Sequence, residues 1–236
     1  MDLSSILVSV VTLAIVGLAI YYYIKTYDSG SEAENPLKSA PVSSIQDGCK
    51  SSTYSNTLPK SYNQPNGLSF AYAGWIRIDD FTYRYGAQKV IFSKGDEKAV
   101  SPCPALLIDA NTNALLVKID TFGQPEIVSV QNIPAKKWIH FAISVDQDSV
   151  NVYIDGTLAS YNSLSQLPKQ NQGSLYISPD GGFDGKIGLL EYYNYSLQPS
   201  DVTALAAISP TEGSSADKGI GVLPPYFDSS WFSGRD

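Results

Sequence analysis

The stretch Trp138–Asp155, WIHFAISVDQDSVNVYID, decides the fold of this chain of 236 residues. Apolar residues alternate with polar or small ones in both halves of the stretch. The apolar positions are Ile139, Phe141, Ile143, Val145, Val150, Val152 and Ile154. A period of two predicts half-buried strands, and the polar residues 146–148 between the halves have the length of a hairpin connection. Asp155 and Gly156 then predict a second tight turn, because glycine accepts a positive φ.

Strand patterns continue on both sides of this hairpin, from about residue 66 to residue 207. The longest are FAYAGWIRI (70–78), KVIFSKG (89–95), GSLYIS (173–178) and GGFDGKIGLLEYYNYSL (181–197), and PALLID, ALLVKID and EIVSVQ are shorter ones. Glycine, proline and asparagine separate them at short intervals, which is typical of an all-β sandwich or jelly roll rather than of βαβ units. After them, Pro199, Ser200 and Asp201 predict the start of a short helix, with the serine or the aspartate as its N-cap.

The central stretch resembles the laminin-G-like, concanavalin A-like jelly roll. In that family a tryptophan, an alternating run, a short polar turn and a V-Y-I-D-G sequence form the central pair of strands. Here V-Y-I-D-G stands at 152–156, and the four longest patterns around it follow in the order that the family has. The resemblance covers residues 66–207 and implies an antiparallel jelly-roll sandwich, which we assign to residues 67–207.

The N-terminal run over residues 3–24 carries no charged side chain. Roughly 20 such residues span the hydrocarbon core of a membrane as a helix. Tyr21, Tyr22 and Tyr23 stand at one end of the run, where an aromatic belt would lie, and Lys25 follows them. A cleaved signal peptide is disfavoured, because no basic segment precedes the run and the run is too long. We therefore predict one N-terminal transmembrane helix over residues 1–25.

Two further segments lack any strand or helix period. The composition of residues 26–66 predicts a linker or stalk, which is either flexible or able to become ordered against a partner. Residues 208–236 predict a tail rich in glycine and proline, and this tail carries four aromatic residues. They are Tyr226, Phe227, Trp231 and Phe232. Exposed aromatic residues at this density often mark contacts, so we expect these four to dock either on their own domain or on a partner.

Charge and cysteine content exclude several classes of site. The net charge is -7 and the isoelectric point is near 4.7, without a basic stripe, which argues against nucleic acid as a partner. Cys49 and Cys103 lack the spacing of a zinc site. They leave two alternatives, a single disulfide that ties the linker to the domain or two free thiols. We predict no metal ion and no cofactor.

The chain lacks the residue patterns of an enzyme. A retaining glycoside hydrolase needs two carboxylates close together, and laminarinase-type relatives supply them from an E-x-D-x-(x)-E run that is missing here. Glu191 has no carboxylate two or four positions away, so we expect a solvated strand residue. His140, the sole histidine, has no G-x-S-x-G motif to serve and is expected as a packed or surface residue. Asp109, Asp180 and Asp184 are candidates for calcium binding, but their spacing is not diagnostic, and we expect them to form turns instead.

The aromatic residues of the domain divide into two groups. Trp75 and Trp138 lie in predicted strands, and we expect both in the core. Phe81, Tyr83 and Tyr85 lie in a predicted loop. An exposed ring with a polar tip suits contact with a glycan or a protein. Tyr83 and Tyr85 therefore join the four tail aromatics as candidate partner contacts.

A second resemblance rests on three short motifs, together with the predicted membrane span and stalk. The motifs are Y-R-Y-G at 83–86, N-I-P-x-x-x-W at 132–138 and P-D-G-G-F-D-G at 179–185. They resemble a family of jelly-roll proteins from large nucleocytoplasmic DNA viruses. This resemblance implies a virion component, a minor capsid protein tied to the internal membrane beneath the capsid.

Three hypotheses for the function follow. The first is a non-enzymatic structural virion protein, with residues 3–24 in the lipid bilayer of the viral inner membrane and a jelly roll that bridges to capsid or other virion proteins. The second is a membrane-tethered lectin that binds glycans during attachment. The third is a glycoside hydrolase, which ranks last because the carboxylate pair is missing.

Overall fold

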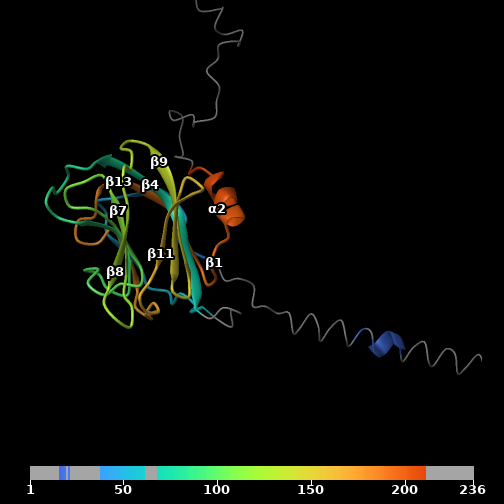
Figure 1. Cartoon of the computed structure of the whole chain (residues 1–236). Coiled ribbons are helices and arrows are strands. Elements are labelled where there is room, and N and C mark those ends of the chain that lie inside the picture. Colours follow the sequence, from blue (N-terminus) through green and yellow to red (C-terminus); the bar gives the residue numbers. More distant parts are fainter. Residues whose placement is uncertain (1–15, 20, 22–37, 62–67, 211–236) are drawn as a thin grey trace, which may run out of the picture. The chain divides into compact units, whose positions relative to one another are not determined.

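The central hairpin lies inside the larger of two antiparallel sheets in the computed structural model, which describes residues 16–19, 21, 38–61 and 68–210 (Figure 1). The larger sheet has the order β1-β13-β4-β9-β10-β11, with β2 also paired to β13. Its strands are β1 (Lys38–Val42), β2 (Gln46–Asp47), β4 (Ser69–Asp80), β9 (Trp138–Asp146), β10 (Ser149–Ile154), β11 (Thr157–Ser163) and β13 (Asp184–Tyr193). All pairings are antiparallel, so the jelly-roll prediction is confirmed.

The smaller sheet has the order β3-β12-β5-β6-β7-β8. Its strands are β3 (Ser52–Tyr54), β5 (Lys89–Lys94), β6 (Ala105–Ile108), β7 (Leu115–Ile119), β8 (Glu126–Val130) and β12 (Leu175–Ile177). Helix α2 (Pro199–Ala206) follows β13 and lies outside the larger sheet (Figure 1).

The register of the hairpin follows the expected turn. Asp146 pairs with Ser149, which leaves Gln147 and Asp148 as the connection. Gln147 has a φ of 54°, the left-handed conformation that a two-residue hairpin turn requires. On its other edge β9 pairs with β4, where Phe141 lies opposite Gly74. The hairpin is thus fixed in the middle of the sheet.

The core lies between the two sheets. Ile139, Phe141, Ile143 and Val145 all point into it and are fully buried. Phe92 of the smaller sheet stacks on Phe141, with ring centroids 6.1 Å apart. A buried aromatic side chain removes a large apolar area from water. This contact therefore joins the two sheets at the centre of the sandwich.

The outer face of the larger sheet is also covered, which the alternating pattern did not predict. Ala142 and Tyr153 on this face pack with Leu197 after β13 and with Val202 of α2. The backbone N–H of Gln198 donates to the carboxylate of Asp201 at 3.1 Å, where the helix begins. The N-cap residue is Gln198, so the prediction of a serine or aspartate cap is wrong.

The linker predicted over residues 26–66 needs a correction. Residues 38–61 contribute β1, β2 and β3, which pair with β13 and β12. The sandwich therefore begins at Lys38 rather than at residue 67. These three strands are short edge segments, and backbone pairing with a preformed sheet stabilises them. Such strands need no apolar alternation of their own.

Two other expectations concern segments that lie largely outside the described residues. Residues 16–19 and 21 of the expected anchor are helical, and the rest of the run 3–24 is outside this part of the chain. Within the described residues, no helix is long and apolar enough to cross a membrane. The tail residues Tyr226, Phe227, Trp231 and Phe232 all lie outside the described region.

The two tryptophans that were expected in the core occupy the outer face of the larger sheet. Trp75 is buried there, 5.3 Å from the ring of His140. Trp138 is only half-buried, because it is the first residue of β9 and stands at the end of the sheet. The expectation that Trp138 belongs to the core is therefore wrong.

This difference predicts unequal costs for two truncations. Phe141→Ala should lower the free energy of unfolding by about 3–5 kcal/mol, because it leaves a cavity between the sheets. Trp138→Ala should cost clearly less, since part of the indole already contacts water. Urea unfolding of the two full-length variants, followed by circular dichroism, measures both values. Equal losses would contradict the placement of these side chains.

Candidate functional site

The three short motifs lie at the same end of the sandwich. The first follows β4, the second precedes β9 and the third precedes β13. Asp80 at the end of β4 pairs with Asp184 at the start of β13. The backbone N–H of Lys136 donates to the carbonyl of Ile78 at 2.6 Å, which brings the second motif to the same edge. We name residues 81–87, 131–137 and 178–184 the motif rim.

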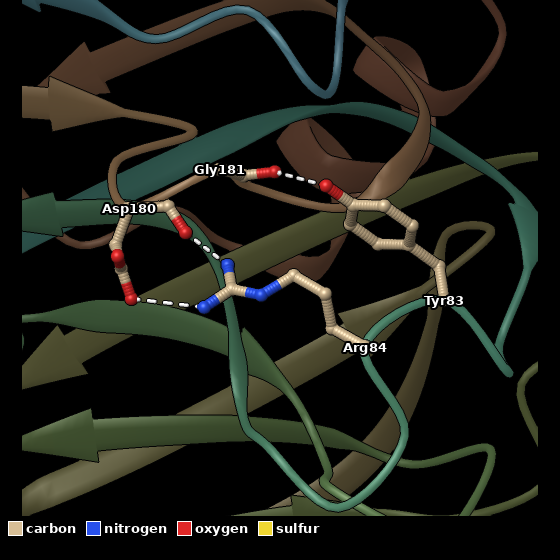
Figure 2. A network of polar contacts seen from close by, with 4 residues as sticks. All are labelled: Tyr83, Arg84, Asp180 and Gly181. Atoms are coloured by element: carbon tan, nitrogen blue, oxygen red, sulfur yellow. Dashed lines mark hydrogen bonds and ion pairs between the residues drawn. The ribbon is translucent and has the colours of Figure 1, made fainter.

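Two consecutive side chains of the first loop hold two consecutive residues of the third (Figure 2). The Tyr83 hydroxyl donates to the carbonyl of Gly181 at 3.0 Å. The Arg84 guanidinium donates through Nη2 to the Asp180 carboxylate at 3.0 Å and through Nη1 to the Asp180 carbonyl. The ion pair is largely exposed and contributes little by itself, about 0–1 kcal/mol. Together the bonds fix the position of one loop on the other.

Residues with positive φ are concentrated at this rim. Arg84, Asn132, Lys136, Ser178 and Asp180 have φ between 49° and 63°. For a residue other than glycine this left-handed conformation is uncommon and costs free energy. Such residues persist only where surrounding contacts hold them. The rim loops therefore have one defined shape, which a binding surface needs.

The floor of the rim comes from the segment that was expected to be a linker. The N–H of Phe183 donates to the carbonyl of Gly48 at 3.0 Å, and the thiol of Cys49 donates to the carbonyl of Phe183 at 3.3 Å. A Cβ atom on Gly182, whose φ is 51°, would lie 2.0 Å from the Gly48 carbonyl oxygen. Only glycine fits there, so the third motif owes one of its glycines to this close approach.

The cysteines do not form the disulfide that was one of two alternatives. Cys49 is exposed at the motif rim, and Cys103 is buried beside Lys94, at the opposite end of β5. Both are free thiols, so the disulfide alternative is wrong and the free-thiol alternative agrees with the structure. Burial raises the pKa of Cys103 to about 12, which keeps it a neutral thiol.

The loop aromatics differ in what they offer to a partner. Tyr85 is 69 % exposed at the tip of the first loop. Tyr83 is half-buried and engaged with Gly181, and Phe81 packs partly against the core. The rim therefore presents one exposed aromatic ring, that of Tyr85, and the exposed carboxylate of Asp180.

Beneath the rim lies a buried lysine that the sequence analysis missed. Lys89 is 1 % exposed, and its ammonium donates to the carbonyl of Phe81 at 3.1 Å. Desolvation lowers the pKa of Lys89. Arg84 was also missed as a site residue, although it stands inside the Y-R-Y-G motif. Neither role has a signal in the local sequence. Arg84 pairs with Asp180, which is remote along the chain, and Lys89 donates to a backbone carbonyl, which no side-chain pattern marks.

The three aspartates have separate roles. Asp109 accepts hydrogen bonds from the backbone N–H groups of Asn111 and Thr112, so it forms a turn. Asp180 pairs with Arg84, and Asp184 begins β13. No group of three or more histidine, cysteine, aspartate or glutamate side chains within the described residues could hold a metal ion.

A small hollow lies on the outer face of the larger sheet. It has a volume of about 50 Å³, and Trp75, His140, Glu191, Leu205 and Ile208 contribute to its lining. This is room for ordered water but far below the several hundred Å³ of a usual ligand pocket. Glu191 is half-buried and accepts a hydrogen bond from the hydroxyl of Tyr193. The expectation of a solvated Glu191 is therefore wrong.

His140 is the titratable group of this hollow. It is 1 % exposed, and its Nδ1 atom has no hydrogen-bond partner within the described residues. Burial lowers the pKa of His140 from 6.5 to about 4. The residue is therefore a packed neutral histidine, one of the two outcomes expected from the sequence.

Residues 50–203 match Laminin_G_3, a family of the Concanavalin A-like lectin/glucanases superfamily. The chain belongs to this family. No curated protein matches the chain. The superfamily takes in lectins and glucanases, so membership shows the fold and leaves the function open.

Solved structures with the same fold include three binding domains of botulinum neurotoxins. The serotype G binding domain has a TM-score of 0.52 at 15% identity over 73% of this chain and 51% of its own. The binding domain of neurotoxin DC, solved with rat synaptotagmin II, has a TM-score of 0.52 at 15% identity over 75% of this chain and 48% of its own. The serotype D domain, solved with N-acetylneuraminic acid, has a TM-score of 0.54 at 10% identity over 75% of this chain and 47% of its own. This chain spans about half the length of these structures, and the identities establish a shared fold alone.

The contacts of Tyr83 predict a loosened third loop when its hydroxyl is removed. Tyr83→Phe should speed amide hydrogen exchange in residues 178–184, with only a small loss of global stability because the hydrogen bond is exposed. Tyr85→Phe is the matched control, because the Tyr85 ring is exposed and lies two positions away in the same loop. Exchange measured by mass spectrometry on both full-length variants tests this. Equal effects of the two changes would show that the hydrogen bond from Tyr83 to Gly181 does not hold the third loop in place.

The burial of His140 predicts sensitivity to acid. Between about pH 6.5 and pH 4 the unfolded chain binds a proton on this residue that the folded protein does not bind. The free energy of unfolding should therefore fall as the pH drops through this window, by about 3 kcal/mol in total, and this group should add no further loss below pH 4.

Denaturant unfolding at a series of pH values measures this slope. His140→Gln removes the titration at a similar side-chain size, and it should flatten the part of the curve between pH 6.5 and pH 5, where few carboxylates titrate. An unchanged slope in the variant would show that another group is responsible.

Proposed function

We propose that this protein is a membrane-anchored, non-enzymatic binding protein that uses the motif rim to hold a protein partner. Residues 3–24 would lie in a lipid bilayer as a single pass. In the virus particle that the three motifs imply, this would be the inner membrane beneath the capsid. The domain would then bridge that membrane to capsid or other virion proteins.

The observation that carries this proposal is the convergence of the three motifs on one rigid rim. The motifs are separated by at least forty residues along the chain, yet Tyr83, Arg84, Asp180 and Gly181 join two of them directly. Loops held on a rigid sandwich are where binding proteins of this kind carry their contacts. The exposed ring of Tyr85 supplies the aromatic anchor that protein interfaces favour.

Charge and chemistry support a protein partner over two other classes. The net charge of -7 disfavours nucleic acid. Catalysis has no part in the proposal, because the sequence lacks the E-x-D-x-(x)-E run that hydrolases of this superfamily use. The hollow beside Glu191 is too small for a sugar ring.

A membrane-tethered lectin is the second candidate. The observation that favours it is that the same rim exposes the Tyr85 ring and the Asp180 carboxylate, since aromatic stacking and carboxylate hydrogen bonds suit a sugar. Of the neurotoxin domains that share this fold over about half of their length, one was solved with N-acetylneuraminic acid and another with rat synaptotagmin II.

Gentle detergent extraction of purified particles tests the proposal. The full-length protein should leave the membrane fraction only with detergent, not with high salt, and should then stay with the capsid shell. Tyr85→Ala should release it into the soluble fraction, with an affinity about tenfold lower. Phe122→Ala is the matched control, because this ring is 71 % exposed outside the motif rim.

The outcomes separate the candidates. Release of the wild-type protein by salt alone would overturn the anchor. Retention of Tyr85→Ala on the shell would overturn the role of the rim. Saturable binding of the wild-type protein on a glycan array, lost in Tyr85→Ala, would favour the lectin instead.

A further inference from the structure

The larger sheet ends at β11, and no other strand of the described region pairs with the far edge of β11. Alternate backbone N–H and C=O groups of an edge strand point away from its neighbour. Such an edge is a template for another strand, so proteins usually protect it.

The other three edges of the sandwich carry such protection. β1 contains Pro41 and an irregular register, both of which interrupt pairing. β3 has only three residues. The segment after β11 covers the start of β8, where the N–H and the hydroxyl of Ser165 donate to the Glu126 carboxylate at 2.8 and 2.6 Å.

β11 differs from these edges in length and composition, although its register on β10 also shifts, between Val152 and Tyr153. Its seven residues, TLASYNS, include no charged residue and no proline. Six of the seven are exposed, among them Leu158 at 49 % and Tyr161 at 61 %. Charged side chains and proline are the usual means of blocking an edge, and neither occurs here, in a chain whose net charge is -7.

The two large apolar side chains of β11 share one face. Leu158 pairs with Tyr153 of β10, and Tyr161 pairs with Asn151. Directly opposite residues lie on the same face of a sheet, and Tyr153 belongs to the outer-face cluster under α2. A register shift between Val152 and Tyr153 is what brings both residues of β11 to this side.

We propose that β11 is a self-association edge, through which two copies of this chain join antiparallel about a two-fold axis. With the axis between Ala159 and Ser160, Leu158 of each copy lies opposite Tyr161 of the other copy. The pairing thus gains two apolar cross-strand contacts by symmetry, and the two larger sheets form one continuous sheet.

A second copy is the occupant that fits this edge. Each copy carries a net charge of -7, so most surfaces of two copies repel each other. The β11 edge brings no charged side chain opposite a like charge. The strand is also self-complementary, because its apolar residues stand symmetrically about its centre. The motif rim lies at the loop end of the sandwich, so this association is independent of what the rim binds.

Sedimentation of the full-length protein in detergent, over a range of concentrations, tests this inference. The wild-type protein should show a monomer–dimer equilibrium. Leu158→Lys and Tyr161→Lys should each weaken the dimer at least tenfold, and the double variant, which places lysine opposite lysine, should be monomeric. Ile127→Lys is the matched control, because Ile127 is 51 % exposed on β8 and should leave the dimer unchanged.

Site-directed cross-linking tests the register. In a Cys49→Ser background, Ala159→Cys mixed with Ser160→Cys should give a disulfide-linked dimer under mild oxidation. Thr157→Cys mixed with Ala159→Cys should not, since these positions do not face each other across the axis.

Three results would overturn the inference. One is a monomer at every concentration up to about 100 μM, which would mean that association is weaker than roughly 5 kcal/mol. The second is a dimer that survives Leu158→Lys together with Tyr161→Lys, which would assign the contact to another segment such as the N-terminal run. The third is a dimer that forms only after deletion of residues 211–236, which would show that the chain's own tail covers this edge.

Discussion

The packing of β9 against the smaller sheet is the contact on which the rest of the structure depends. Phe141 stacks on Phe92 across the sandwich, and Tyr72 of the neighbouring strand β4 also stacks on Phe92, with centroids 5.3 Å apart. These rings are buried, so each removes a large apolar area from water. Because the three residues come from three strands, their stacking fixes how β4, β5 and β9 lie relative to one another.

The geometry of the motif rim follows from that register. β4 and β13 are adjacent in the larger sheet, and the pairing of Asp80 with Asp184 puts the loop after one beside the loop before the other. Tyr83 and Arg84 can then reach Gly181 and Asp180 without any further adjustment of the strands. A slip of two residues along β13 would separate these groups by about 6–7 Å, which is beyond hydrogen-bond reach. The rim is in this sense a product of sheet register rather than of local loop sequence.

The two surfaces proposed for contacts use different physics. The rim offers a shaped set of side chains on strained backbone, which suits selective recognition. The β11 edge offers unpaired backbone groups with little side-chain chemistry, which suits pairing with an identical strand. Since the rim stands at the loop end and β11 at the side of the sheet, a dimer would present two rims. Two rims on one dimer would strengthen attachment to a partner that repeats, as capsid proteins do.

The sequence by itself determined the strands of the central region and the class of the fold. The apolar residues of β9 recur with a period of two, because each must point into a core between two sheets. They are Ile139, Phe141, Ile143 and Val145, and this alternation can be recognised from neighbouring residues alone. The hairpin at residues 146–149 was equally readable, since turn residues act within a few positions. The helix after β13 was located, although its cap was not.

Only the tertiary structure decided which remote residues meet. Arg84 and Asp180 are 96 positions apart, and no local pattern marks one as the partner of the other. β1, β2 and β3 had no apolar alternation to reveal them, because the sheet they join supplies their stability. The sequence does not predict the exposure of Trp138 or Glu191 for the same reason. The exposure of a strand residue depends on whether α2 or another segment covers that part of the sheet. The alternation of a strand says which residues share a face, but what covers that face depends on the whole chain.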